Sequence, residues 1–191
     1  RHSFLRIIGR AAWRCIVTRL ARVSPLRSWI FEVVNWNLLA GPTVACAAAG
    51  MLSTEGRCKT FDASANGYVR SEGCGALVLG ACSGSATASA ESACLLSNGA
   101  LLSAVTLRQD GRSASLTAPN GSAQRALITA TLVRAGLAHG VPDAVETHGT
   151  GTALGDPTEA AALVQALAVW AVAEAPVVLL SGVKASVGHM E

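Results

Sequence analysis

Aromatic and charged residues are scarce in this chain: 4% of its residues are Phe, Trp or Tyr, and 14% carry charge. So little aromatic surface argues against a protein that stacks on nucleic-acid bases. The 51% share of apolar residues excludes a disordered chain. A length of 191 residues suffices for one ordinary domain with a sizeable core. We therefore expect a folded protein, rich in small residues, with no nucleic-acid partner.

Acidic residues are missing before Glu32, while residues 1–30 hold seven arginines. Such a start is typical of an organelle transit segment or of a basic face for an anionic partner. A chain cut or misread upstream is the simpler interpretation, and we favour it. Residues 1–28 show helix-like apolar spacing up to Pro25. We expect this segment to pack poorly on the rest, because buried guanidinium groups without acidic partners are costly.

Cysteine pairs and long apolar runs are missing as well. The six cysteines form no C-x-x-C pair, and the chain shows no secretory signal peptide. This argues against a zinc site and a disulfide framework and favours a reducing compartment. No apolar run reaches the length of about 18 residues that predicts a transmembrane helix. We expect a cytoplasmic protein with no metal and no membrane partner, organelle targeting by the basic start being the alternative.

Strand-like and helix-like segments alternate along the remainder of the chain. Residues 81–100, rich in Ala and Ser, fit either a helix on a sheet or a linker. Helices are expected at 122–135 and 157–172. Strands are expected at 29–39 (closed by Gly41-Pro42), 77–79, 101–107, 141–147 and 177–183. This alternation predicts a layered α/β fold.

Histidines follow two of the expected strands. His148 comes after 141–147 and begins a Gly-Thr-Gly-Thr loop, and Lys184 and His189 follow 177–183. Folds of the α/β class bind ligands at strand ends, and an imidazole can donate a hydrogen bond near neutral pH. Taken singly, a histidine is more often a core or surface residue, and a lysine a surface residue. The Gly-Thr loop could also cradle phosphate, but it lacks the P-loop spacing.

Two motifs in these segments are highly specific. Residues 146–157 (ETHGTGTALGDP) closely resemble the E-A-H-G-T-G-T-x-x-G-D-P motif of β-ketoacyl synthases, the condensing domains of polyketide and fatty-acid synthases. Residues 183–189 (VKASVGH) resemble the V-K-x-N-x-G-H motif of the same family. Weaker matches lie at 58–78, 109–112 and 116–121, the last two resembling signatures of modular polyketide synthases. The resemblance covers roughly residues 29–191, in the family's order.

This resemblance implies a thiolase-like α/β/α/β/α fold that is present only in part. Residues 29–80 would end its N-terminal half, 81–100 would be a degenerate connector, and 101–191 would form a truncated C-terminal half. Residues 1–28 have no match. The family reaction is the decarboxylative Claisen condensation of an acyl thioester with a malonyl group on acyl carrier protein.

The resemblance also assigns roles to residues. His148 and His189 match the pair that aids malonyl decarboxylation, Lys184 matches the lysine that orders this centre, and Thr150 and Thr152 match the threonines that contact the phosphopantetheine arm. No cofactor is bound directly, the substrates being carried on the phosphopantetheine of acyl carrier protein, and the complete domain would be a homodimer. We expect the two histidine side chains on adjacent loops, about 5–8 Å apart, within reach of one thioester oxygen.

The sequence departs from the family at the nucleophile. The family's D-T-A-C-S-S-S-like turn has no counterpart, Cys15 is flanked by bulky residues, and Cys46 is better explained as a small buried side chain. Ser186 stands where the family has asparagine. The leading hypothesis is thus an acyltransferase of the ketosynthase family that is inactive as an isolated chain. The alternatives are a non-catalytic partner, similar to a chain-length factor, or an inactive truncated gene product.

Overall fold

The computed structural model describes residues 4–6, 28–80, 103–113, 118–136, 142–169 and 177–190. The chain divides into two compact units. The first contains residues 1–12, 37–71 and 104–191, and the second contains residues 13–36 and 72–103. Cys15 and residues 81–100 lie outside the described residues. No helix in the described ranges has the length and apolar character needed to cross a membrane.

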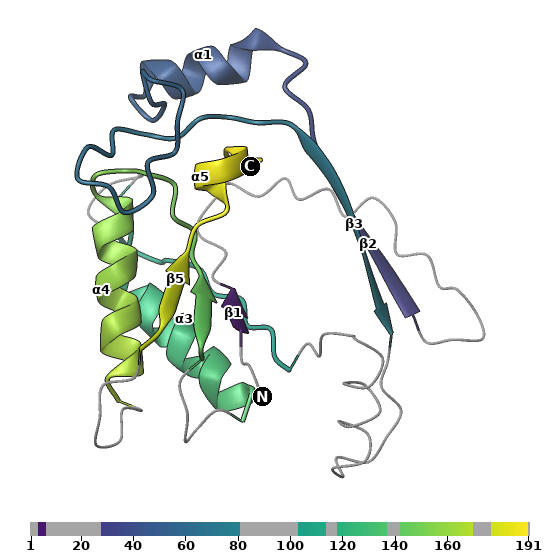
Figure 1. The fold of residues 1–191 in the computed structure, drawn as a ribbon, viewed down its shortest axis with the longest axis vertical. Helices are drawn as coiled ribbons and strands as arrows, with labels where there is room; N and C mark the ends of the chain where they lie inside the picture. Colours follow the sequence, from purple (N-terminus) through teal and green to yellow (C-terminus); the bar gives the residue numbers. More distant parts are fainter. Residues whose placement is uncertain are drawn as a thin grey trace. The chain divides into compact units, whose positions relative to one another are not determined.

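A three-stranded parallel sheet forms the centre of the first unit (Figure 1). Its strand order is β1 (Phe4–Arg6), β4 (Ala144–Glu146) and β5 (Leu179–Ser181). Parallel neighbours end at the same sheet edge, so the loops after β4 and β5 leave side by side. Both loops carry the candidate residues of the sequence motifs.

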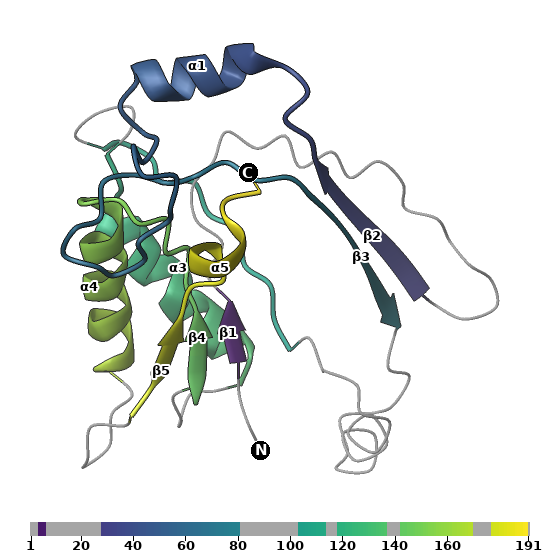
Figure 2. The same ribbon diagram turned by 45° about the horizontal axis from the view of Figure 1, so that its top comes forward.

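Two helices cover one face of this sheet (Figure 2). They are α3 (Gly121–Arg134) and α4 (Gly155–Leu167). Both pack on Val145 of β4, which is fully buried. The remaining core residues are Ile128, Leu132, Leu163, Ala166 and Leu167, with Val178 packed against them. Burial of each large side chain contributes about 1.5–3 kcal/mol, so this helix pair holds the sheet in place.

The ends of α3 follow standard capping chemistry. The Asn120 side chain accepts a hydrogen bond from the Ala123 N–H at 3.1 Å, while its amide group donates to the carbonyls of Asp110 and Arg112. Gly136 follows the helix with a φ of 73°, the left-handed conformation that ends helices. The Asn120 side chain therefore ties the backbone at Asp110 and Arg112 to the start of α3.

Two further helices belong to the first unit, α1 (Ala40–Ala48) and the short α5 (Lys184–Val187). A long loop, residues 49–72, follows α1. One short bridge joins Leu52 to Tyr68 within it, and a second joins its Arg70 to His189. The second unit contains the antiparallel pair β2 (Ser28–Asn35) and β3 (Gly73–Gly80). These elements agree with an α/β fold.

Several sequence expectations were wrong in detail. Phe4–Arg6 form a strand rather than part of a helix, since they pair with β4. Gly41 and Pro42 begin α1 instead of closing a strand, because proline suits the first turn of a helix. The expected buried strand at 77–79 lies within β3, but Leu77 is 58% exposed.

Two further differences concern residues 103–107 and Cys46. Residues 103–107 form no strand. Val105 and Leu107, which would share one face of the expected strand, are 58% and 89% exposed. An alternating segment becomes a strand only where a partner and a buried face support it. Cys46 is half-buried rather than buried, and no other residue of α1 is buried either.

Candidate active site

The carboxyl ends of β4 and β5 are joined by polar side chains. The Thr147 hydroxyl and N–H both donate to the Ser181 carbonyl, at 2.8 and 2.9 Å. Glu146 accepts from the Ser181 hydroxyl and, at 2.7 Å, from the Val183 N–H. The two loops that follow these strands therefore start from a fixed geometry.

Glu159 of α4 holds the backbone of the loop that contains His148. Its carboxylate accepts the N–H groups of His148 at 2.7 Å and Gly149 at 3.0 Å, and only 4% of Glu159 is exposed. Burial raises the pKa of Glu159, although the two N–H donors and Lys184 oppose this. The backbone of the loop is thus oriented by a buried acid.

Asp156 holds the next part of the loop in the same way. Its carboxylate accepts the N–H groups of Gly151 and Thr152, and a third from Phe61 at 2.9 Å. Asp156 and Glu159 are three residues apart, on the first turns of α4, and so they lie on one face of the helix. Acids there also suit the positive end of the helix dipole.

Two glycines of the loop have no room for a side chain. A Cβ at Gly149 would lie 2.5 Å from Cγ2 of Thr60, and one at Gly151 would lie 2.4 Å from the backbone nitrogen of Lys59. Both have positive φ, at 45° and 78°. The Gly-Thr-Gly-Thr pattern is therefore explained by the close approach of residues 59–60.

Lys184 lies at the start of α5, and its ammonium group donates to the His148 carbonyl at 2.7 Å. This hydrogen bond links the loop after β5 to the loop after β4. The lysine therefore acts on the backbone of the histidine loop.

The rings of His148 and His189 are close together, as the sequence predicted. Their centroids are 5.4 Å apart and the ring planes meet at 87°, edge to face. Burial lowers the pKa of His148 to about 3, and the neighbouring charges of Lys184 and His189 act in the same direction. His148 is therefore neutral at physiological pH, with one N–H to donate and one nitrogen to accept.

The two threonines of the loop are near each other but differ in exposure. Thr150 is buried, with 8% of it exposed, whereas Thr152 is half-buried. Their hydroxyl oxygens lie 3.4 Å apart. The Thr152 hydroxyl also accepts the Gly155 N–H at 3.2 Å, at the start of α4. Contact of either threonine with a phosphopantetheine arm remains a prediction.

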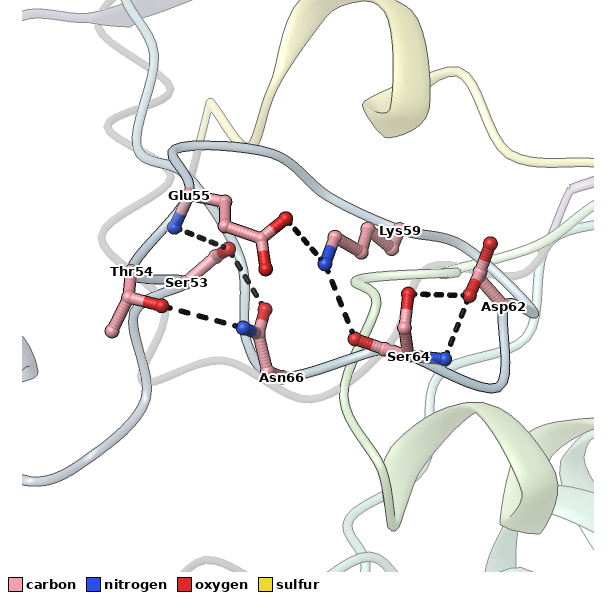
Figure 3. A network of polar contacts seen from close by, with 7 residues as sticks. All are labelled: Ser53, Thr54, Glu55, Lys59, Asp62, Ser64 and Asn66. Carbon is pink, nitrogen blue, oxygen red and sulfur yellow. Dashed lines mark hydrogen bonds and ion pairs between the residues drawn. The ribbon is translucent and has the colours of Figure 1, made fainter.

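The loop of residues 49–72 supports the histidine loop from the side. A polar network braces residues 53–66 internally (Figure 3), including an ion pair between Lys59 and Glu55 at 2.5 Å. Ser64 donates twice to Asp62 and so lowers the pKa of that carboxyl. The braced loop presents Thr60, whose hydroxyl donates to the Gly149 carbonyl at 2.6 Å.

A cavity of about 480 Å³ opens beside Lys184. It is lined by Arg57, Arg70 and Lys184, and no carboxylate side chain is among its lining residues. In the described part of the chain no group of three or more His, Cys, Asp or Glu side chains could hold a metal ion. The cavity thus offers cationic and hydroxyl groups to an anionic ligand.

Three cysteines fall in the described ranges, and all are free. Cys58 is 3% exposed, and its sulfur accepts the Val69 N–H at 3.3 Å and faces the Val69 carbonyl at 3.8 Å. Cys46 lies on α1, and Cys74 is exposed on β3 of the second unit. Cys58 therefore serves packing of the 49–72 loop.

The acids that hold the histidine loop, and the ring beside His189, were not predicted from the sequence. Glu159 and Asp156 could have been found from their three-residue spacing at a helix start directly after the loop. Thr60, Phe61 and Tyr68 gave no such signal, because their partners are far away in sequence.

The loops after two adjacent parallel strands thus bring together the two histidines and the lysine of the ketosynthase-like motifs, backed by a buried acid. Family models agree: "Beta-ketoacyl synthase, N-terminal domain" matches residues 33–98, and "Beta-ketoacyl synthase, C-terminal domain" matches residues 99–191. The chain belongs to the β-ketoacyl synthase family, and it is a partial domain with a thiolase-like fold.

Individual relatives are polyketide synthases. A phenolphthiocerol/phthiocerol polyketide synthase of Mycobacterium tuberculosis is 42% identical over 82% of this chain, and polyketide synthase GfsA of Streptomyces halstedii is 42% identical over 83%. The chain spans only 7% and 2% of those two proteins.

Solved ketosynthase domains have the same fold. The ketosynthase from module 6 of the Bacillus subtilis bacillaene synthase superimposes with a TM-score of 0.72 at 30% identity, over 85% of this chain and 28% of that structure. The oxazolomycin ketosynthase domain of Streptomyces albus gives 0.70 at 33% identity, again over 85% of this chain and 27% of that one. The domain boundaries expected within residues 29–191 remain a prediction.

Proposed function

We propose that this chain carries the decarboxylating half of a ketosynthase site, with His148 and His189 as the catalytic pair and Lys184 as the residue that orders it. The observation that carries the proposal is the edge-to-face pair of imidazoles, 5.4 Å between centroids, at the ends of adjacent parallel strands. The substrate would be a malonyl thioester on the phosphopantetheine arm of an acyl carrier protein.

The chemistry needs hydrogen-bond donors at one oxygen. When the bond between the malonyl α-carbon and its carboxylate breaks, CO₂ leaves and the electron pair moves into an enolate, with negative charge on the thioester oxygen. Donors aimed at that oxygen stabilise the transition state more than the ground state. His148, whose pKa lies at about 3, is neutral and keeps one ring N–H with which it can donate to that oxygen.

The surroundings suit this substrate. The Lys184 hydrogen bond and the Glu159 carboxylate fix the backbone on both sides of His148, so little reorganisation is needed during reaction. The cationic cavity beside Lys184 would attract the phosphate and carboxylate of the malonyl donor. Thr150 and Thr152 would contact the phosphopantetheine arm, no cofactor would be bound directly, and the complete domain would pair as a homodimer.

The condensation step would need an acylated nucleophile, which we propose this chain does not form. Cys58 is buried against Val69, and neither Cys15 nor Cys46 lies in the family's nucleophile motif. Incubation with acyl thioesters should leave the intact mass unchanged. A stoichiometric adduct on Cys15, Cys46 or Cys58 would contradict this part of the proposal.

Decarboxylation itself can be tested with a malonyl-pantetheine thioester. Protonation of the enolate by water should give the acetyl thioester and CO₂, which ¹³C NMR detects. We expect the wild-type chain to turn over faster than buffer alone, and His148→Ala and His189→Ala to lose this turnover. The control Val133→Ala, at an exposed position of α3, should keep it. Turnover equal to buffer, or unchanged by the histidine substitutions, would refute the proposed function.

A further inference from the structure

The ring of Tyr68 lies beside the histidine pair. Its centroid is 5.0 Å from that of His189, with the planes tilted by 51°, and His189 in turn contacts His148. His189 therefore contacts one aromatic ring of the 49–72 loop and one of the loop after β4. Tyr68 is the only tyrosine in the chain.

From this geometry we propose that Tyr68 is a positioning residue, which fixes the orientation of the His189 imidazole toward the thioester oxygen. The inference rests on the proposed function for the meaning of that orientation. The contact between the two rings is independent of it.

The backbone around Tyr68 is tied to both histidine segments. The preceding residue, Gly67, donates its N–H to the Gly151 carbonyl at 2.9 Å, and the following residue, Val69, accepts the His189 N–H at 2.8 Å. Tyr68 thus lies between two neighbours in sequence, one bonded to the His148 loop and the other bonded to His189.

The position of Tyr68 along its own loop is also fixed. Its N–H donates to the Met51 carbonyl at 3.1 Å, and its carbonyl accepts the Ser53 N–H at 2.9 Å. Gly67 leaves no space for movement, since a Cβ there would lie 2.6 Å from the backbone of Leu52 and Ser53. A half-buried ring on so constrained a backbone is a firm support for a neighbouring ring.

The backbone of His189 does not by itself fix the orientation of its ring. The Ser71 N–H and the Val69 carbonyl hold its backbone, but backbone bonds do not set the second side-chain torsion of histidine, which is broad and roughly two-fold. Tilted aromatic contacts favour particular ring orientations. Because a displacement of about 1 Å in a reacting group can reduce rate by about 100-fold, the orientation of His189 matters for the chemistry.

The first experiment reads the ring contact without any turnover. Chain labelled with 3-fluorotyrosine gives one ¹⁹F resonance, from position 68. We expect it to shift in His189→Gln and to stay in place in Val133→Ala. In ¹⁵N-edited spectra of the histidine side chains, the His189 signals should broaden or move in Tyr68→Ala and stay near wild type in Tyr68→Phe, which keeps the ring.

The second experiment measures decarboxylation of malonyl-pantetheine. Tyr68→Ala should lose about 10- to 100-fold in kcat, Tyr68→Phe should stay within about 3-fold of wild type, and Trp36→Ala, which removes an exposed ring, should have no effect. A fall in kcat with KM little changed separates positioning from substrate binding.

The outcomes separate the two proposals. A chain with the expected ¹⁹F and imidazole responses but no turnover would refute the proposed function and keep the ring contact. Turnover with His189 signals and kcat unchanged in Tyr68→Ala would overturn the positioning role alone. If Tyr68→Ala does not fold, an unshifted ¹⁹F resonance in His189→Gln would still overturn it.

Discussion

The depressed pKa of His148 makes a specific prediction about stability against pH. In the folded chain its pKa is about 3, because the imidazole is buried beside Lys184 and His189, against an ordinary value of 6.5. As pH falls through 6.5 the unfolded chain takes up a proton at this position, while the folded chain does not until about pH 3. Stability contributed by neutral His148 is therefore complete above 6.5 and is lost progressively below it.

The size of the effect follows from these values. Below pH 6.5 each further pH unit costs about 1.4 kcal/mol until the folded chain also protonates. Between about pH 7.5 and pH 5.0 the loss from His148 is thus up to about 2 kcal/mol. Glu159, whose pKa is raised by burial, acts with the opposite sign, since stability from that group falls as pH rises above its ordinary value of 4.5.

The assay compares urea unfolding of the wild-type chain and His148→Gln at the two pH values. Glutamine keeps a donor and an acceptor but does not titrate in this range. Relative to His148→Gln, the wild type should lose up to about 2 kcal/mol more on going from about pH 7.5 to 5.0. Equal pH dependence in the two proteins would refute the burial of a neutral His148.

Substitutions at three positions, with a control at a fourth, test other parts of the structure by unfolding free energy. Glu159→Gln should cost about 1.5–3 kcal/mol, because the amide nitrogen cannot accept an N–H of the His148 loop. The control Glu55→Gln, at an exposed carboxylate that pairs with Lys59, should cost under about 1 kcal/mol; similar losses would contradict the buried clamp. Gly151→Ala should cost more than about 3 kcal/mol, since its Cβ would meet the Lys59 backbone, and a near-neutral result would contradict that close approach. Phe61 has a φ of 57°, so Phe61→Asn should be more stable than Phe61→Val by about 1–2 kcal/mol, and the reverse order would show that Phe61 is not left-handed.

The sequence predicted what depends on local pattern. The helix expected at 122–135 follows from the spacing of neighbouring apolar residues, and α3 spans Gly121–Arg134. The glycine-rich turn after β4 likewise depends on neighbouring residues. The specific motifs predicted His148 and His189 on adjacent loops, and the ring distance of 5.4 Å confirms that their side chains are close together. The expected helix at 157–172 was also present, although α4 begins earlier, at Gly155, and ends at Leu167.

Contacts between residues far apart in sequence could not be predicted from local pattern. Phe4–Arg6 became a strand because β4 pairs with it, and nothing in their own spacing indicates that partner. Thr60 contacts Gly149 across 89 positions of sequence, and Lys184 bonds to the His148 carbonyl across 36. The sequence predicted that His148, His189 and Lys184 lie near one another, but not the atoms through which the lysine and the loop act.

The proposal that His148 and His189 act together on one thioester oxygen can be tested by the decarboxylation rates of His148→Ala, His189→Ala and the double variant. Groups that act as a unit are not additive. We expect the double variant to be no slower than the slower single variant. Independent losses that multiply in the double variant, or full activity in either single variant, would show that the two histidines do not act as a pair.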